Sequence, residues 1–109
     1  MPIDLEQAKD ADYKNIADSI ETEFGRLDGL IHNAAILGER TSVGSYSIDT
    51  WEKVMQVNVN APFALTKHCL ALLHKSTTAS ILFTSSSVGL KGRAYWGAYA
   101  ASKLSLIHI

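Results

Sequence analysis

Cysteine is nearly absent from this sequence, since Cys69 is the only one in 109 residues. A single thiol excludes an intramolecular disulfide framework, and Cys69 lies in an apolar stretch where we expect a small buried side chain. No set of cysteines and histidines has the spacing of a zinc site, because His68 and His74 lie on different faces of an expected helix. We therefore predict no metal site.

Charge of one sign and long apolar runs are also lacking. Ten basic and eleven acidic residues give a formal net charge of -1, which does not indicate nucleic acid or an anionic membrane as a partner. No apolar run approaches the roughly 18 residues of a membrane span, and the N-terminus lacks the pattern of a signal peptide. We expect a cytoplasmic protein that binds a small molecule.

The composition, 47% hydrophobic and 19% charged, is typical of at most one globular domain. Apolar residues at helical intervals predict a helix over 11–24, and Gly25 stands where a C-terminal cap would. Short apolar runs predict buried strands at 30–33 and 80–85, and 2–5 is typical of a further short strand. The alternation of strands and helices indicates a parallel α/β sheet.

The longest predicted helix runs from Thr50 to about Lys75. Asp49 and Glu52 have the spacing of a capping box, which predicts that the helix begins there. Pro62 lies inside this helix and has no N–H for the carbonyl of Asn58, four residues earlier. We therefore expect a kink that leaves this oxygen free to hold a water molecule, although an ordinary buried proline kink is the alternative.

The final helix should begin near Trp96 or Gly97, and it carries Tyr99 and Lys103 one turn apart. On a helix these two positions share a face. Because an ammonium favours a phenolate, the lysine makes the tyrosine a better general acid or base. The spacing alone is common by chance, so a solvated helix face is the alternative interpretation.

A serine, an asparagine and a short signature accompany this pair. Ser86 lies thirteen positions before Tyr99, with Gly89 after it, Asn58 lies in QVNVNAPF, and 32–35 reads His-Asn-Ala-Ala. Together these residues resemble the short-chain dehydrogenase/reductase family. That family has a serine thirteen residues before a Tyr-x-x-x-Lys pair, a helix asparagine and an Asn-Asn-Ala-Gly signature, from which the histidine and the second alanine depart.

The resemblance implies a catalytic role for each matching side chain. Tyr99 would transfer a proton to or from the substrate oxygen, and Ser86, rather than its neighbouring serines, would hydrogen-bond that oxygen. Lys103 would bind the nicotinamide ribose and favour the Tyr99 phenolate. Asn58 would hold a water molecule in the proton relay. The expected catalytic set is Asn58, Ser86, Tyr99 and Lys103.

The same resemblance implies a cofactor cleft. Asp4 would touch the adenine ring, and Asn33 with its two neighbouring alanines would line the cleft at the carboxyl end of a strand. The expected cofactor-binding residues are Asp4, Asn33, Ala34, Ala35, Tyr99 and Lys103. The cofactor of the full-length family is NAD or NADP. We do not expect the 109 residues alone to hold it.

The family begins with a Thr-Gly-x-x-x-Gly-x-Gly turn that binds the pyrophosphate, and the 109 residues contain no such pattern. The resemblance therefore implies a partial Rossmann-like doubly wound parallel sheet, truncated at both ends. Residues 1–109 would be the central fragment of a single NAD(P)-binding domain. This fragment would lack the N-terminal Gly-rich segment and the C-terminal substrate segment.

Two functions remain open. One is a fragment of an NAD(P)-dependent oxidoreductase that interconverts an alcohol and a carbonyl compound, inactive by itself and a homo-oligomer if it folds. The alternative is a non-catalytic interaction fragment that uses its exposed helices as an association surface.

Overall fold

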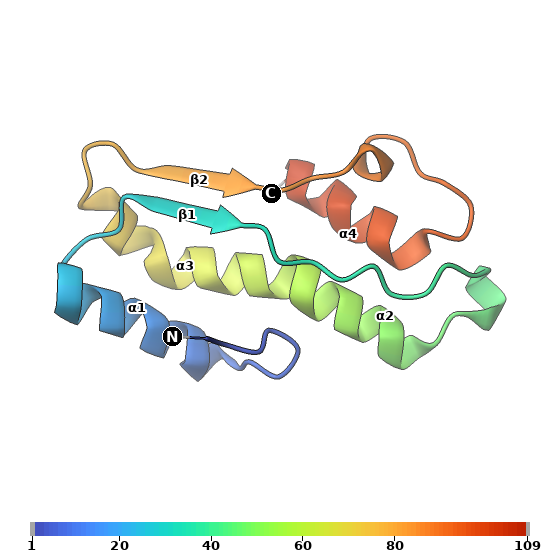
Figure 1. The fold of residues 1–109 in the computed structure, drawn as a ribbon, viewed down its shortest axis with the longest axis horizontal. Helices are drawn as coiled ribbons and strands as arrows, with labels where there is room; N and C mark the ends of the chain where they lie inside the picture. Colours follow the sequence, from blue (N-terminus) through green and yellow to red (C-terminus); the bar gives the residue numbers. More distant parts are fainter. Residues whose placement is uncertain (1, 109) are drawn as a thin grey trace.

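Two parallel strands and four α-helices make up the computed structural model, which describes residues 2–108 (Figure 1). In chain order the elements are α1 (Asp10–Phe24), β1 (Gly29–His32), the 3-10 turn η1 (Val43–Ser45), α2 (Ile48–Met55), the π-helical segment η2 (Gln56–Asn60), α3 (Ala61–His74), β2 (Ser80–Phe83), the 3-10 turn η3 (Ser87–Gly89) and α4 (Gly97–His108). The predicted α/β class is confirmed.

The sheet consists of β1 and β2 in parallel, with Leu30 opposite Ile81. These two side chains face the core formed with α3, whereas Ile31 and Leu82 point to the other face and remain 66% and 57% exposed. Both strands run towards the end of the molecule where α4 lies (Figure 1). Within residues 2–108, therefore, helices cover one face of the sheet, and α4 lies at its carboxyl edge.

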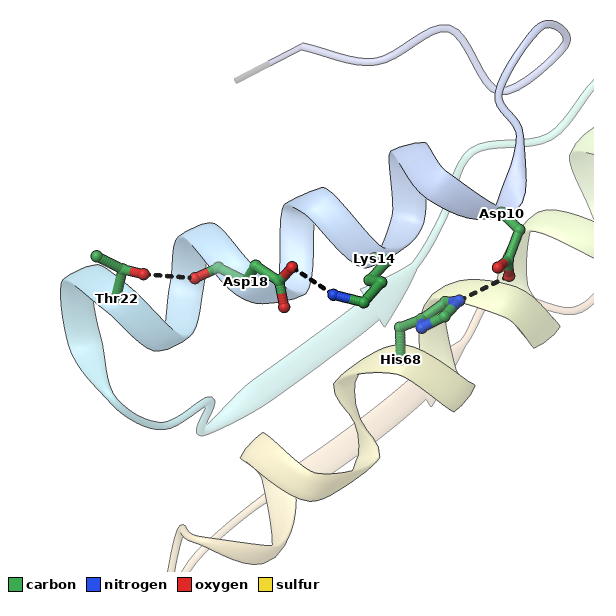
Figure 2. Close-up of polar contacts among 5 residues, drawn as sticks. All are labelled: Asp10, Lys14, Asp18, Thr22 and His68. Carbon is green, nitrogen blue, oxygen red and sulfur yellow. Dashed lines mark hydrogen bonds and ion pairs between the residues drawn. The ribbon is translucent and has the colours of Figure 1, made fainter.

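The main core lies between α1 and α3. Its buried members are Ala17, Cys69, Leu72 and Leu73, and Leu30 and Ile81 of the sheet pack against them. Cys69 is 1% exposed, which confirms that it is a small buried side chain, and burial raises the pKa of its thiol. At the edge of this packing, His68 Nε2 of α3 lies 2.7 Å from Asp10 Oδ1 of α1 (Figure 2).

The C-terminal cap of α1 is Gly25, as predicted. Its φ of 74° lies in the left-handed region that glycine adopts without strain, and its N–H donates to Ile20 O and Glu21 O. The strand predicted at 2–5 is wrong. The chain turns there, with Ala8 N donating to Asp4 O, because an extended segment needs a neighbouring strand to satisfy its backbone and none lies beside it within residues 2–108.

The N-cap of the long helical run is Ser47, so the capping box predicted at Asp49 is wrong. Ser47 has extended backbone angles, and its hydroxyl accepts from Thr50 N at 3.3 Å. Asp49 instead lies in the first turn, where a carboxylate favours the helix through the macrodipole. Ser47 is further held by Glu39, whose carboxylate accepts from Ser47 N and from the Thr50 hydroxyl.

The predicted interruption near Pro62 takes the form of a π-helical segment. Because Pro62 has no N–H for the Asn58 carbonyl, the hydrogen-bond ladder widens, and Ala61 N donates five residues back to Gln56 O. Pro62 then lies in the first turn of α3, where a missing N–H costs nothing. No helix within residues 2–108 is long and apolar enough to cross a membrane.

Candidate active site

Tyr99 and Lys103 are both carried by α4, and their side chains meet. The Lys103 ammonium nitrogen lies 5.6 Å from the centroid of the Tyr99 ring, which is cation–π distance. Trp96, three residues before Tyr99, also packs against the Tyr99 ring, edge-on and with ring centroids 5.9 Å apart. The helix spacing therefore produces an ammonium beside a phenol.

Lys103 is anchored to the carboxyl end of β2. Its Nζ donates to Thr84 O at 2.9 Å, and the residue is only 2% exposed. Burial penalises the charged ammonium and lowers the pKa of Lys103 below its ordinary value. A partly desolvated cation is thus held at the edge of the sheet, next to the tyrosine.

Asn58 lies in η2 and is 1% exposed. Its side chain makes three hydrogen bonds: Oδ1 accepts from Ile36 N at 2.9 Å, and Nδ2 donates to Ile36 O at 2.9 Å and to Ser102 Oγ at 3.0 Å. Ser102 extends this hydrogen-bond network, since its hydroxyl donates to Tyr99 O. The amide therefore ties the loop after β1 to the helix that carries Tyr99.

Ser86 follows β2 by three residues and caps η3, with its Oγ accepting from Val88 N at 3.4 Å. The turn it caps packs against α4 through Gly89, where a side chain would not fit. The half-buried serine and the two side chains of α4 are therefore supported by adjoining segments at one end of the molecule.

Of the predicted cofactor-binding residues, Tyr99 and Lys103 lie on α4, and Asn33, Ala34 and Ala35 follow β1. Asn33 follows β1, and its Oδ1 accepts from the Thr84 hydroxyl at 3.0 Å. Ala34 and Asn33 line a small hollow of about 80 Å³ that Leu5 closes from the N-terminal turn. Asp4, beside Leu5, is exposed, and its carboxylate accepts from Glu6 N.

Ala35 lies in the same loop as Ala34 and is exposed. Within residues 2–108 the structure thus places Asn33 and Ala34 at one hollow and places Asp4 next to a residue that lines it.

His32, which departs from the family signature, is buried at the end of β1. Its ring stacks on Phe83 at 4.8 Å between centroids, and its Nε2 lies 2.8 Å from Thr66 Oγ1 of α3. Burial lowers the pKa of His32. The imidazole therefore packs the two strand ends together and fastens them to α3.

Two positioning residues were missed by the sequence analysis. Thr84 contacts both Asn33 and Lys103, and its place directly after a buried strand is a signal that could have drawn attention to it. Ser102 is completely buried between Asn58 and Tyr99. Nothing in the local sequence distinguishes Ser102 from any other small helix residue.

Comparisons with known proteins show which family this chain resembles. The family model for short chain dehydrogenases matches residues 1–109. The uncharacterized oxidoreductase YciK of Escherichia coli K12 is 48% identical over 103 residues, which cover 94% of this chain and 41% of YciK.

Solved structures of short chain dehydrogenases also match nearly the whole of this chain. The crystal structure of a short chain dehydrogenase from Salmonella enterica has a TM-score of 0.94 and 47% identity, covering 97% of this chain and 44% of that chain. A structure from Escherichia coli CFT073, in complex with NADPH, has a TM-score of 0.91 and 48% identity, covering 95% of this chain and 43% of that chain. The 109 residues thus span less than half the length of these relatives.

Proposed function

Because the chain belongs to the short-chain dehydrogenase family, we propose that it forms the central part of an NAD(P)-dependent oxidoreductase that interconverts an alcohol and a carbonyl compound. One observation carries this proposal: the Lys103 ammonium is held between Thr84 O and the Tyr99 ring. This arrangement gives a phenol a fixed cationic neighbour at the carboxyl edge of a parallel sheet, where α/β folds bind their ligands.

Two features of this edge support a nicotinamide nucleotide as the cofactor. The hydrogen bond from Lys103 to Thr84 O uses one of the three N–H donors of the ammonium, so two more can reach ribose hydroxyls. Asn33 and Ala34 line the neighbouring hollow, and His32 is the one titratable side chain among its lining residues. Burial lowers the pKa of His32 and so favours its neutral form. When bound, the nucleotide would supply or accept the hydride.

The chain's own residues would control the proton. Tyr99 would exchange a proton with the substrate oxygen, helped by the adjacent ammonium of Lys103. Ser86 would donate a hydrogen bond to that oxygen through its O–H, while its Oγ still accepts from Val88 N. The Asn58 side chain is fully engaged with Ile36 and Ser102, so its contribution to a proton relay would come from its main-chain carbonyl, which Pro62 cannot bond.

The 109 residues by themselves should be inactive. They contain no Gly-rich turn for the pyrophosphate, and holding reactants in a reactive geometry supplies roughly 7 to 11 kcal/mol of barrier lowering. We expect neither tight binding of NADH or NADPH nor turnover of aldehydes and ketones by this chain alone, measured by nicotinamide fluorescence and absorbance.

A positive test uses a chimera in which residues 2–108 replace the matching segment of the Escherichia coli CFT073 protein solved with NADPH. We expect this chimera to bind NADPH and Lys103→Met to weaken the binding. In turnover of a panel of aldehydes and ketones, Tyr99→Phe should lower the rate about 10²- to 10⁴-fold. Tyr13→Phe, which removes a phenol hydroxyl from α1 outside the candidate site, is the matched control. Equal NADPH affinity with and without the Lys103 ammonium, or full activity of Tyr99→Phe, would refute the proposal.

Self-association is a second candidate function. Phe63 and Leu70 lie seven residues apart on one face of α3 and are 57% and 43% exposed, and Leu104 of α4 is 47% exposed. Apolar side chains in this arrangement favour contact with a second copy of the chain. Sedimentation of the chain and of Phe63→Lys would test this, since a dimer that persists in the variant would exclude the α3 face.

A further inference from the structure

A second hollow lies beside the candidate active site, between the start of α2 and the loop that leads into α4. Its volume is about 470 Å³, within the range of small-molecule sites, and its surface is mostly apolar. None of the four candidate catalytic residues lines it. The side chains that matter for what it could bind are Val43, Tyr46, Ile48, Trp51, Arg93 and Tyr95.

The walls of this hollow are held in place before any ligand arrives. Tyr46 and Trp51 pack edge to face with centroids 6.0 Å apart, and the Tyr46 hydroxyl accepts from Glu39 N at 3.2 Å. Gly38, with φ of 73°, makes room for this tyrosine, because a Cβ there would lie 2.5 Å from the Tyr46 oxygen. A prearranged aromatic wall favours a flat or bulky apolar ligand.

Tyr95 is held in a strained conformation at the same hollow. Its φ of 69° makes it the one residue other than glycine with a positive φ in the described part of the chain, and the residue is 61% exposed. Left-handed backbone at a bulky residue costs free energy and is concentrated at functional sites. Here the strain keeps an aromatic ring at the mouth of the hollow.

One cationic side chain lines this hollow, and a second lies on the neighbouring Trp96. Arg93 lines the hollow, and Arg40 stacks over Trp96 at 5.7 Å from its centroid. The ion pairs of residues 2–108 involve neither arginine. The nearest acidic side chain of the loop, Glu39, is engaged by Ser47 N and the Thr50 hydroxyl. An anionic group on the ligand would therefore complete the site.

The hollow adjoins the catalytic helix. Gly97, its first residue, lines the hollow, and Trp96 contacts Tyr99 edge-on. We propose that this hollow binds the body of the substrate, and that the substrate is a small organic acid with an aromatic or branched apolar body whose carboxylate pairs with Arg93. The assignment of this ligand as substrate rests on the proposed function, whereas its binding does not.

Two matched probes test the binding with the full 109-residue chain and no nucleotide. Naphthalene-2-carboxylate and naphthalene-2-carboxamide share one apolar body and differ in charge. Binding would be followed by the amide and indole NMR signals of the chain, and we expect shifts at Trp51 and Tyr95, with the carboxylate bound more tightly.

Arg93→Gln should weaken the carboxylate about two- to fivefold and leave the carboxamide unchanged. Lys91→Gln removes an exposed cation of the same loop that does not line the hollow and is the matched control. Ile48→Glu, at a 75% exposed lining position, should weaken the carboxylate more than the carboxamide.

Several results would overturn the inference. These are equal binding of both probes, an equal effect of Arg93→Gln and Lys91→Gln, shifts away from the hollow, absence of saturable binding, or loss of binding as the chain self-associates. Tyr99→Phe should leave probe binding unchanged. If the chain binds the probes but the chimera fails the Tyr99 and Lys103 tests, the binding site stands and the proposed function is rejected. If the chimera passes those tests but the chain does not bind the probes, the proposed function stands and this site is rejected.

Discussion

Gly89 lies directly against the main chain of Lys103: a Cβ added at Gly89 would lie 2.9 Å from the carbonyl carbon of Lys103 and 3.0 Å from its oxygen. Backbone atoms of a helix cannot move aside as the end of a flexible side chain can. This contact packs the turn that follows Ser86 onto α4. The distance between Ser86 and α4 therefore depends on glycine, which has no side chain, at position 89.

Replacing Gly89 by alanine should therefore destabilise the chain by about 1 to 3 kcal/mol, because the added methyl overpacks η3 against α4. Gly92→Ala is the control, since no atom lies within 4 Å of a Cβ at Gly92, and it should change stability by less than about 0.5 kcal/mol. Urea unfolding followed by far-UV circular dichroism measures both. Equal stability of the two variants would show that η3 does not pack this closely.

Asn58→Ala should cost about 3 kcal/mol, because it leaves the backbone of Ile36 and the hydroxyl of Ser102 without their partner in a buried position. Asn60→Ala removes the same side chain from the same π-helical segment at an exposed position. That variant should stay within about 0.5 kcal/mol of the parent in urea unfolding. A loss of similar size at both positions would contradict the structural role assigned to Asn58.

Lys103→Met should raise the free energy of unfolding at neutral pH by about 1 kcal/mol, because the variant no longer buries an ammonium. The pKa of Lys103 is lowered by burial in the folded chain from its ordinary value of 10.5. Between the lowered pKa of the folded chain and the ordinary value of 10.5, the unfolded chain binds more protons than the folded chain. The free energy of unfolding of the parent should therefore rise with pH across this window.

The Lys103→Met variant should lack that rise, and Lys91→Met, at an exposed position, should retain it. Urea unfolding at a series of pH values up to 10.5 gives the comparison. A less stable Lys103→Met chain would mean that the bond to Thr84 O outweighs the burial of the charge.

The contact between Asp10 and His68 should give the packing of α1 on α3 an acid dependence (Figure 2). The hydrogen bond from His68 lowers the pKa of Asp10 below its ordinary value of 3.8. Its contribution to stability is therefore fully present above 3.8 and is lost as the pH falls through the lowered pKa.

Asp10→Asn and His68→Gln should each remove this contribution, and the double variant should lose no more than either alone. Asp18→Asn is the control, because Asp18 pairs with Lys14 on the same helix rather than across the interface. Unfolding measured over acidic pH values reports the difference. Additive losses in the double variant would show that the two side chains do not interact in solution.

Local rules determined much of this protein from the sequence by itself. Apolar periodicity predicted α1, short apolar runs predicted the two strands, and Gly25 predicted the end of α1. Pro62 predicted a kink in the long helix, and the structure has a π-helical segment directly before it. Each of these depends on sterics or hydrogen bonds within a few residues, which sequence shows directly. The one-turn spacing likewise brought Lys103 to the Tyr99 ring.

Only the tertiary structure decided where the polar groups of the site find their partners. Asn58 bonds Ile36 and Ser102, which lie 22 and 44 residues away, and Lys103 bonds Thr84, 19 residues away. Such choices depend on which segments pack together, because a buried polar group must use whatever partner the packing places within reach. For the same reason the segment 2–5 forms no strand and leads into a turn at 5–7. Its extended form has the right residues but no adjacent strand within residues 2–108 with which to pair.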